Sequence, residues 1–108
     1  MKRGDLVTVA LQGDYGKPRP AVIVQSNWLE GTDSVLVCPL TSTLREAPIF
    51  RLTIAPHPSN GLTVPSQVMV DKVVAVCRDK LGARIGRLDD ESVLVLNRML
   101  ALVLGLAD

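Results

Sequence analysis

The stretch PRPAVIVQSNWLEGTDSVLVCPLTS, Pro18–Ser42, contains two runs of residues that are typical of β-strands. Ala21–Gln25 (AVIVQ) and Ser34–Leu40 (SVLVCPL) are rich in β-branched side chains, which favour a pleated backbone. The segment between them, Ser26–Asp33, contains turn-forming residues. We therefore expect two strands here, joined by a loop.

Runs of the same kind recur on both sides of this stretch. They are Asp5–Leu11, Ile49–Ile54 and Gln67–Val76, and polar or turn-rich segments separate them. The segment Ala55–Pro65 holds three prolines, so it should be irregular. This spacing of short strands predicts a compact antiparallel sheet or barrel.

The end of the chain has helical rather than strand periodicity. Asp89 or Asp90 can cap a helix, and Gly105 is a natural end. Apolar residues follow helical spacing at Val93, Leu96, Leu100 and Val103–Leu104. Further apolar side chains widen that stripe, so the helix should pack on the sheet and also on a second subunit. We expect one domain, residues 1–108, mainly β: a small SH3-like barrel of five to seven strands with a C-terminal helix.

Composition narrows the function. Aromatic residues make up 3% of the chain, too few for the exposed base-stacking rings of RRM or OB domains. The formal net charge is +1, but Lys72–Arg87 holds five basic side chains against one carboxylate. This strip is either a local phosphate-binding patch or an ordinary solvated surface.

The remaining general features indicate a soluble cytoplasmic protein. Cys38 and Cys77 lie in apolar runs, which suggests two buried, inert thiols rather than a metal site. The start MKRGDLVTVAL lacks the apolar region of a signal peptide. The longest apolar run, Met99–Leu104, is far shorter than the roughly 20 residues that span a bilayer.

Few residues carry side chains suited to catalysis or phosphate binding. His57 is the single histidine and stands between two prolines, so it suggests a loop surface rather than an acid–base pair. Arg19 also lies between prolines, which restrict the backbone and suit a phosphate clamp. Its plain alternative is a surface arginine.

Two more polar pairs stand at or within strands. Thr41 and Ser42 follow the run Ser34–Leu40, and their hydroxyls can donate to a phosphate oxygen or cap a turn. Asp71 and Lys72 interrupt an apolar run, where they form either a site or an outward-facing ion pair. From the residues alone both readings stay open.

At these same residues the sequence resembles the MazF/PemK toxin family. The resemblance rests on five stretches that follow one another in the family's order: RGDLVTVAL at Arg3–Leu11, KPRPAVIVQS at Lys17–Ser26, VLVCPLTS at Val35–Ser42, SQVMVDKVVAV at Ser66–Val76 and GRLDDESVLVLNRMLALVLGL at Gly86–Leu106.

The resemblance implies a two-fold homodimer of SH3-like barrels that cuts single-stranded RNA without a metal or other cofactor. The ribose 2′-hydroxyl would attack the adjacent phosphorus and leave a 2′,3′-cyclic phosphate and a 5′-hydroxyl. Carried over by position, the catalytic residues are Arg19 and Thr41, with Asp71 from the Kid-like members. The expected RNA contacts are Tyr15, Lys17, Pro20, Ser42, Gln67 and Lys72.

The sequence also departs from the family. Kid-like members carry an arginine two positions before the aspartate, where this chain has Met69, and many others have glutamine near Lys72. Arginine stays protonated at neutral pH and cannot be the base, so Asp71 either takes that role or orients Arg19. The RNA sequence that is cut cannot be carried over.

Two alternatives share the fold. A gyrase poison of the CcdB kind acts through a tryptophan near the C-terminus, whereas Trp28 is the only tryptophan here. A catalytically silent SH3-like module would need more exposed rings for a peptide groove. A toxin implies a cognate antitoxin, and we expect its disordered, acidic, partly apolar segment to cover the dimer face and block the Arg19 loop.

Overall fold

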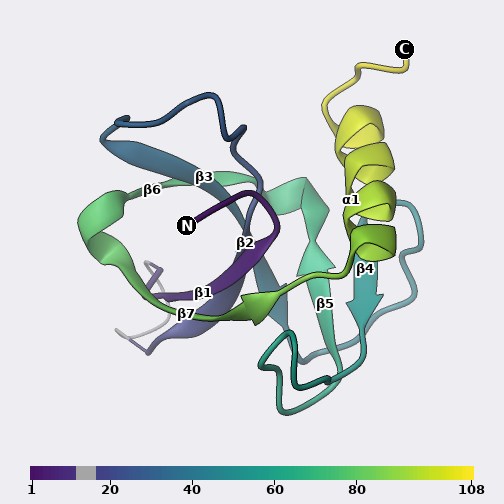
Figure 1. Ribbon diagram of the computed structural model, residues 1–108. Helices are drawn as coiled ribbons and strands as arrows, with labels where there is room; N and C mark the ends of the chain where they lie inside the picture. Colours follow the sequence, from purple (N-terminus) through teal and green to yellow (C-terminus); the bar gives the residue numbers. More distant parts are fainter. Residues whose placement is uncertain (12–16) are drawn as a thin grey trace.

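The computed structural model describes residues 1–11 and 17–108 (Figure 1). Within these residues the chain forms one antiparallel sheet, two 3-10 turns and one helix. The strands are β1 (Asp5–Val9), β2 (Arg19–Ile23), β3 (Ser34–Thr41), β4 (Arg51–Ile54), β5 (Ser66–Met69), β6 (Val74–Cys77) and β7 (Leu81–Arg87). The turns η1 (Val70–Lys72) and η2 (Arg78–Lys80) flank β6, and α1 (Asp90–Val103) follows β7.

Strand β3 is the centre of the sheet. Its first half, from Ser34 to Val37, pairs with β6, whereas Leu40 and Thr41 pair with β5. Strand β2 lies along its other edge, followed by β1 and β7. One strand therefore links the two halves of the molecule.

The expected barrel is present as a curved but open sheet. Figure 1 shows β1, β2, β3, β6 and β7 arranged around a ring, with β4, β5 and α1 beside it. The chain itself joins β6 to β7 through η2, and in the described ranges no strand pairing closes the ring at that point. The mainly β architecture with a C-terminal helix is confirmed, but the sheet is not a closed barrel.

Two apolar cores explain the continuous apolar runs. Alternate residues of a strand face opposite sides, and in β2 Val22 packs under α1 while Ala21 and Ile23 fill the ring. All three are 4% exposed or less. A strand buried on both faces needs apolar residues at every position, which is why AVIV shows no polar alternation.

One predicted strand is wrong. Gln67–Val76 is not continuous, because η1 separates β5 from β6. Asp71 and Lys72 are exposed in that turn, while the neighbouring Val70 is fully buried. The turn lets the chain pair with both ends of β3.

Strand β7 was not among the runs found from residue pattern. It contains Gly82 and Gly86, which normally weaken a strand. Here they permit close approach: a Cβ on Gly82 would lie 2.2 Å from Thr8 Oγ1, and one on Gly86 would lie 2.3 Å from the Asn60 carbonyl carbon. The glycines are therefore required by packing against β1 and the loop before β5.

The helix ends are as expected. The Asp89 carboxylate accepts the Ser92 N–H at 2.7 Å, and this bond holds the pKa of Asp89 below its ordinary value. At the other end Gly105 has φ +75°, and the Leu106 N–H donates to the Ala101 carbonyl at 2.8 Å. In the described part of the chain no helix is long and apolar enough to cross a membrane.

The two cysteines differ. Cys38 is fully buried as predicted, but Cys77 is exposed, so the prediction for Cys77 is wrong. The strand period explains this, because Val76 points into the ring and Cys77 points away from it. Burial raises the pKa of the Cys38 thiol to about 12, an effect opposed by Arg3 and slightly reinforced by Asp71.

We expect an aqueous thiol reagent to modify Cys77 quickly in the folded protein and to leave Cys38 untouched. Cys38 is buried and stays a thiol at neutral pH, whereas the thiolate is the reactive form. Thiol titration before and after denaturation checks this, with Cys77→Ser as the control that abolishes the fast phase. Fast modification in Cys77→Ser would contradict the burial of Cys38.

Candidate functional site

The ends of two neighbouring strands place Arg19 and Thr41 together. Strands β2 and β3 are antiparallel with Ala21 opposite Pro39, so Arg19 begins one strand at the end where Thr41 finishes the other. Arg19 is exposed, and its backbone is fixed by pairing with Val9 of β1. The sheet therefore holds an arginine and a hydroxyl side by side at one edge.

A small cavity forms where these residues meet, which we call the Arg19 hollow. It has a volume of about 250 Å³, and its walls come from β1, β2, β3, β7 and the loop before β5. The predicted residues that line it are Arg19, Pro20, Thr41 and Ser42. Gly61 and Ile85 also line it.

The Thr41 hydroxyl is oriented by its own turn. Thr41 Oγ1 accepts the backbone N–H of Thr43 at 3.1 Å. A hydroxyl that accepts one bond in this way can still donate its hydrogen to another group. Thr41 is thus a positioned donor in the hollow that Arg19 also lines.

A second cavity, the Asp71 hollow, adjoins the first at Thr41. Its volume is about 530 Å³, and it is lined by β3, the segment after it, β4, β5 and η1. Asp71 and Lys72 line this hollow, not the Arg19 hollow, and Thr41 lines both. Of the three residues predicted as catalytic, Arg19 therefore lines one hollow, Asp71 the other, and Thr41 both.

Gln67 occupies a supporting position. It is 6% exposed, opposite Thr41 in the register of β3 and β5. Its amide oxygen accepts the Arg45 N–H at 3.0 Å, and its amide nitrogen donates to the Arg45 carbonyl at 2.9 Å. These bonds hold the segment after Thr41, which favours a positioning role over direct RNA contact.

The other predicted RNA contacts lie nearer the surface. Lys17 and Ser42 are exposed, and Pro20 is half-buried in the wall of the Arg19 hollow. Tyr15 lies outside the described residues.

The basic strip predicted between Lys72 and Arg87 does not form one patch. Arg84 pairs with Asp5 at 3.3 Å, and Arg87 pairs with Asp90 at 3.3 Å. Lys72 lines the Asp71 hollow, whereas the others are exposed elsewhere along η2 and β7. The alternative of an ordinary solvated surface fits most of the strip.

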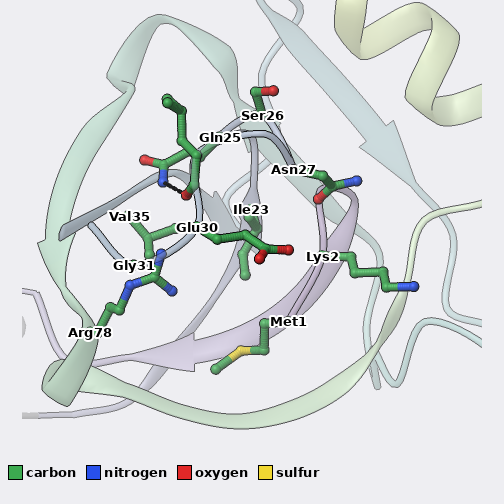
Figure 2. Close-up of a pocket in the computed structure, with 11 residues that line it drawn as sticks. Met1, Lys2, Ile23, Gln25, Ser26, Asn27, Glu30, Gly31, Val35 and Arg78 are labelled. Atoms are coloured by element: carbon green, nitrogen blue, oxygen red, sulfur yellow. Dashed lines mark hydrogen bonds between the residues drawn. The ribbon is translucent and has the colours of Figure 1, made fainter. Parts of the chain in front are cut away.

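A cavity at the opposite end of β3 holds none of the predicted residues (Figure 2). It measures about 420 Å³ and lies between the N-terminus, the loop after β2 and Arg78. Gln25 fixes that loop, since its amide nitrogen donates to the Leu29 carbonyl and to Thr32 Oγ1, each at 3.0 Å. His57 is likewise part of a surface loop, with Nδ1 2.8 Å from Ser59 Oγ.

Among the side chains of the Asp71 hollow that the residue pattern missed is Arg51. Arg51 begins β4, where a single arginine before an apolar run is indistinguishable from a surface residue. Only the pairing of β4 with β5 brings it beside Gln67 and opposite Met69.

Comparison with known proteins shows that the chain is similar to a family of toxins. The family model described as "PemK-like, MazF-like toxin of type II toxin-antitoxin system" matches residues 2–104. A curated protein of Mycolicibacterium smegmatis, "Probable endoribonuclease MazF", is 43% identical over 108 residues, which is 99% of both chains.

Solved structures show the same fold. An endoribonuclease from a mycobacterial species, in complex with its cognate antitoxin, is 29% identical with a TM-score of 0.80, covering 98% of this chain and 96% of that one. The MazF of Deinococcus radiodurans is 22% identical with a TM-score of 0.80, covering 97% and 96%, and supports the fold alone.

Proposed function

The chain belongs to the PemK-like, MazF-like toxins of type II toxin-antitoxin systems, and we propose that its endoribonuclease site is built around Arg19 and Thr41. One observation carries this proposal: Arg19, Thr41 and Ser42 line the same hollow, from the ends of adjacent strands. A forked cation and two hydroxyls at one point form a set of donors suited to a phosphodiester.

The proposed reaction is a metal-independent transesterification at a specific sequence in single-stranded RNA. The ribose 2′-oxygen forms a bond to the adjacent phosphorus, and the bond from phosphorus to the 5′-oxygen breaks. A base takes the 2′-hydroxyl proton, and the leaving 5′-oxygen gains one. The products are a 2′,3′-cyclic phosphate and a 5′-hydroxyl.

Arg19 and Thr41 act on the charge that develops in this step. The phosphorane carries more negative charge on its non-bridging oxygens than the ground state does. Arg19, always charged, stabilises those oxygens, and Thr41 donates a hydrogen bond that holds the phosphate in line. The backbone of Arg19 is fixed by pairing with β1, and the Thr41 hydroxyl is oriented by the Thr43 N–H, so both residues are in place before RNA arrives.

Asp71 has two candidate roles. It lies in the adjoining hollow rather than beside Arg19, so it suits proton removal from a ribose that spans Thr41. Orientation of Arg19 is the second role, and that role requires movement, since the ion pairs among the described residues do not include Arg19 with Asp71.

We propose two protein partners in the cytoplasm, a second copy of the chain and an antitoxin. Helix α1 leaves Leu94 and Leu102 57% and 46% exposed after its inner face has packed, and Leu104, directly after the helix, is 58% exposed, which suits a subunit contact. A cognate antitoxin binds the mycobacterial endoribonuclease of known structure. For this chain we propose an acidic, partly apolar antitoxin segment that covers the Arg19 hollow.

Incubation of the antitoxin-free protein with a long single-stranded RNA in excess EDTA tests the function. We expect discrete cleavage products with 5′-hydroxyl ends, because protein donors alone supply the charge stabilisation. Intact RNA from a folded protein would contradict the proposal and favour gyrase or another protein target. Cleavage that EDTA abolishes would contradict its metal independence.

A further inference from the structure

The guanidinium of Arg51 donates to neutral acceptors within the described part of the chain. Its Nη1 donates to the Thr43 carbonyl at 3.2 Å and lies 3.4 Å from Gln67 Oε1. Both acceptors are uncharged. The ion pairs of the described residues are Arg84–Asp5 and Arg87–Asp90, so Arg51 has no carboxylate partner there.

The guanidinium is also incompletely hydrogen-bonded. Arg51 Nε is buried and has no partner within the described residues. Native proteins leave few buried donors unsatisfied, and each one calls for an explanation. A charge held partly inside the protein by neutral acceptors is screened less than a surface charge, so it attracts an anion more strongly.

The surroundings of Arg51 fit an anion. It lines the Asp71 hollow together with two other cations, Arg45 and Lys72, against one carboxylate, Asp71. The hollow meets the Arg19 hollow at Thr41, so an anion beside Arg51 lies next to the proposed cleavage point.

We propose that Arg51 binds the phosphate adjacent to the scissile phosphate of single-stranded RNA. This inference rests on the proposed function and adds a substrate-binding residue to it. Arg19 and Thr41 hold the phosphate that reacts, and Arg51 holds its neighbour, which fixes the direction of the strand across Thr41. Because this contact is the same in the ground state and the transition state, it contributes to binding and not to the chemical step.

The test measures binding of a single-stranded 2′-O-methyl RNA, which lacks the attacking hydroxyl and cannot be cut. Affinity is measured as a function of salt for the wild type, Arg51→Gln and Arg51→Met. Loss of one phosphate contact on a single strand reduces the slope of log K against log salt by about 0.7. We expect that reduction, with affinity about ten- to a hundredfold weaker.

Arg78→Gln is the matched control. Arg78 also donates only to uncharged acceptors, the Thr32 carbonyl and hydroxyl, but it follows β6 beside Ser34. Ser34 and Thr41 are the ends of β3, roughly 23 Å apart at about 3.3 Å per residue. Arg78→Gln removes the same charge and should leave the slope unchanged.

Two charge-removing variants are used because one of them could fail to fold. Arg51→Gln keeps a donor for the Thr43 carbonyl, and Arg51→Met keeps the apolar stem of the side chain. The salt slope is measured on each variant whose melting temperature matches that of the wild type. Arg51→Lys restores the charge and should restore the slope. With ordinary RNA, we expect a raised KM and a nearly unchanged kcat.

An unchanged slope in a folded Arg51→Gln or Arg51→Met would overturn the inference and leave Arg51 as a residue that only holds its loop. An equal reduction of the salt slope in Arg78→Gln would overturn it too, because the effect would then not depend on where the charge lies. Both results leave the proposed function intact if the wild type cuts ordinary RNA. If the wild type neither cuts nor binds RNA, that result contradicts the proposed function itself.

Discussion

Arg19→Ala is expected to lower the RNA cleavage rate by about 10²–10³, the usual effect of removing one preorganised donor from a charge-stabilising site. The side chain is exposed at the start of β2 and is not part of either apolar core, so the fold should remain intact. Single-turnover cleavage of RNA in EDTA, with circular dichroism to check folding, measures both quantities. The loss should appear in kcat and not only in KM, because the interaction strengthens in the transition state.

Arg78→Ala provides the control for this variant. It removes another exposed arginine, at the far end of β3, and should cleave at nearly the wild-type rate. Arg19→Lys adds a second comparison: it retains charge but loses the planar fork, so partial recovery is expected. A normal turnover rate for Arg19→Ala would remove Arg19 from the mechanism and leave the location of the site open.

The strands around Arg19 and Thr41 could be predicted because their burial is unusually complete. Val22 and Val37 are fully buried, and strands buried on both faces appear in the sequence as continuous apolar runs. The adjacency of Arg19 and Thr41 followed from the family resemblance, and the register of β2 and β3 then places them at one edge. Their chemical roles are not settled by that placement and stay predictions.

The features that escaped prediction depend on contacts between distant segments. In the run from Gln67 to Val76, Asp71 and Lys72 interrupt the apolar pattern where the chain turns at η1. The same interruption is expected of an outward-facing ion pair within one strand, so the turn could not be told from the sequence. Gly86 in β7 is explained only by the Asn60 backbone against it.

Arg51 also escaped prediction because its surroundings come from distant segments of the chain. Nothing around it in the sequence marks it as functional, and its place beside Gln67 arises from pairing between β4 and β5. Conversely, Gln67 resembled an RNA contact in the sequence, but it is buried and bonded to Arg45. The residue type alone does not distinguish a residue that contacts RNA from one that positions a neighbouring segment.

Leu96→Ala should lower the free energy of unfolding by about 2–5 kcal/mol, the range for emptying a leucine site in a packed core. Leu96 is fully buried and belongs to the cluster that joins α1 to the sheet, with Leu40, Val68 and Val70. Urea denaturation of both proteins at one concentration measures the difference. Arg98→Ala is the control on the same helix, since Arg98 is exposed and is not among the leucines proposed for the subunit contact, and it should change stability by less than about 0.5 kcal/mol.

The same variant tests how the helix supports the site. Leu40 and Val70 directly precede Thr41 and Asp71, so the core beneath α1 fixes the segments that carry two of the proposed catalytic residues. At a temperature where Leu96→Ala is still folded, cleavage should fall only modestly, because Leu96 packs behind those residues and not in either hollow. On warming, activity should be lost in step with unfolding, several degrees below the wild type. Equal stability losses in Leu96→Ala and Arg98→Ala would contradict the burial of Leu96 in the core beneath α1.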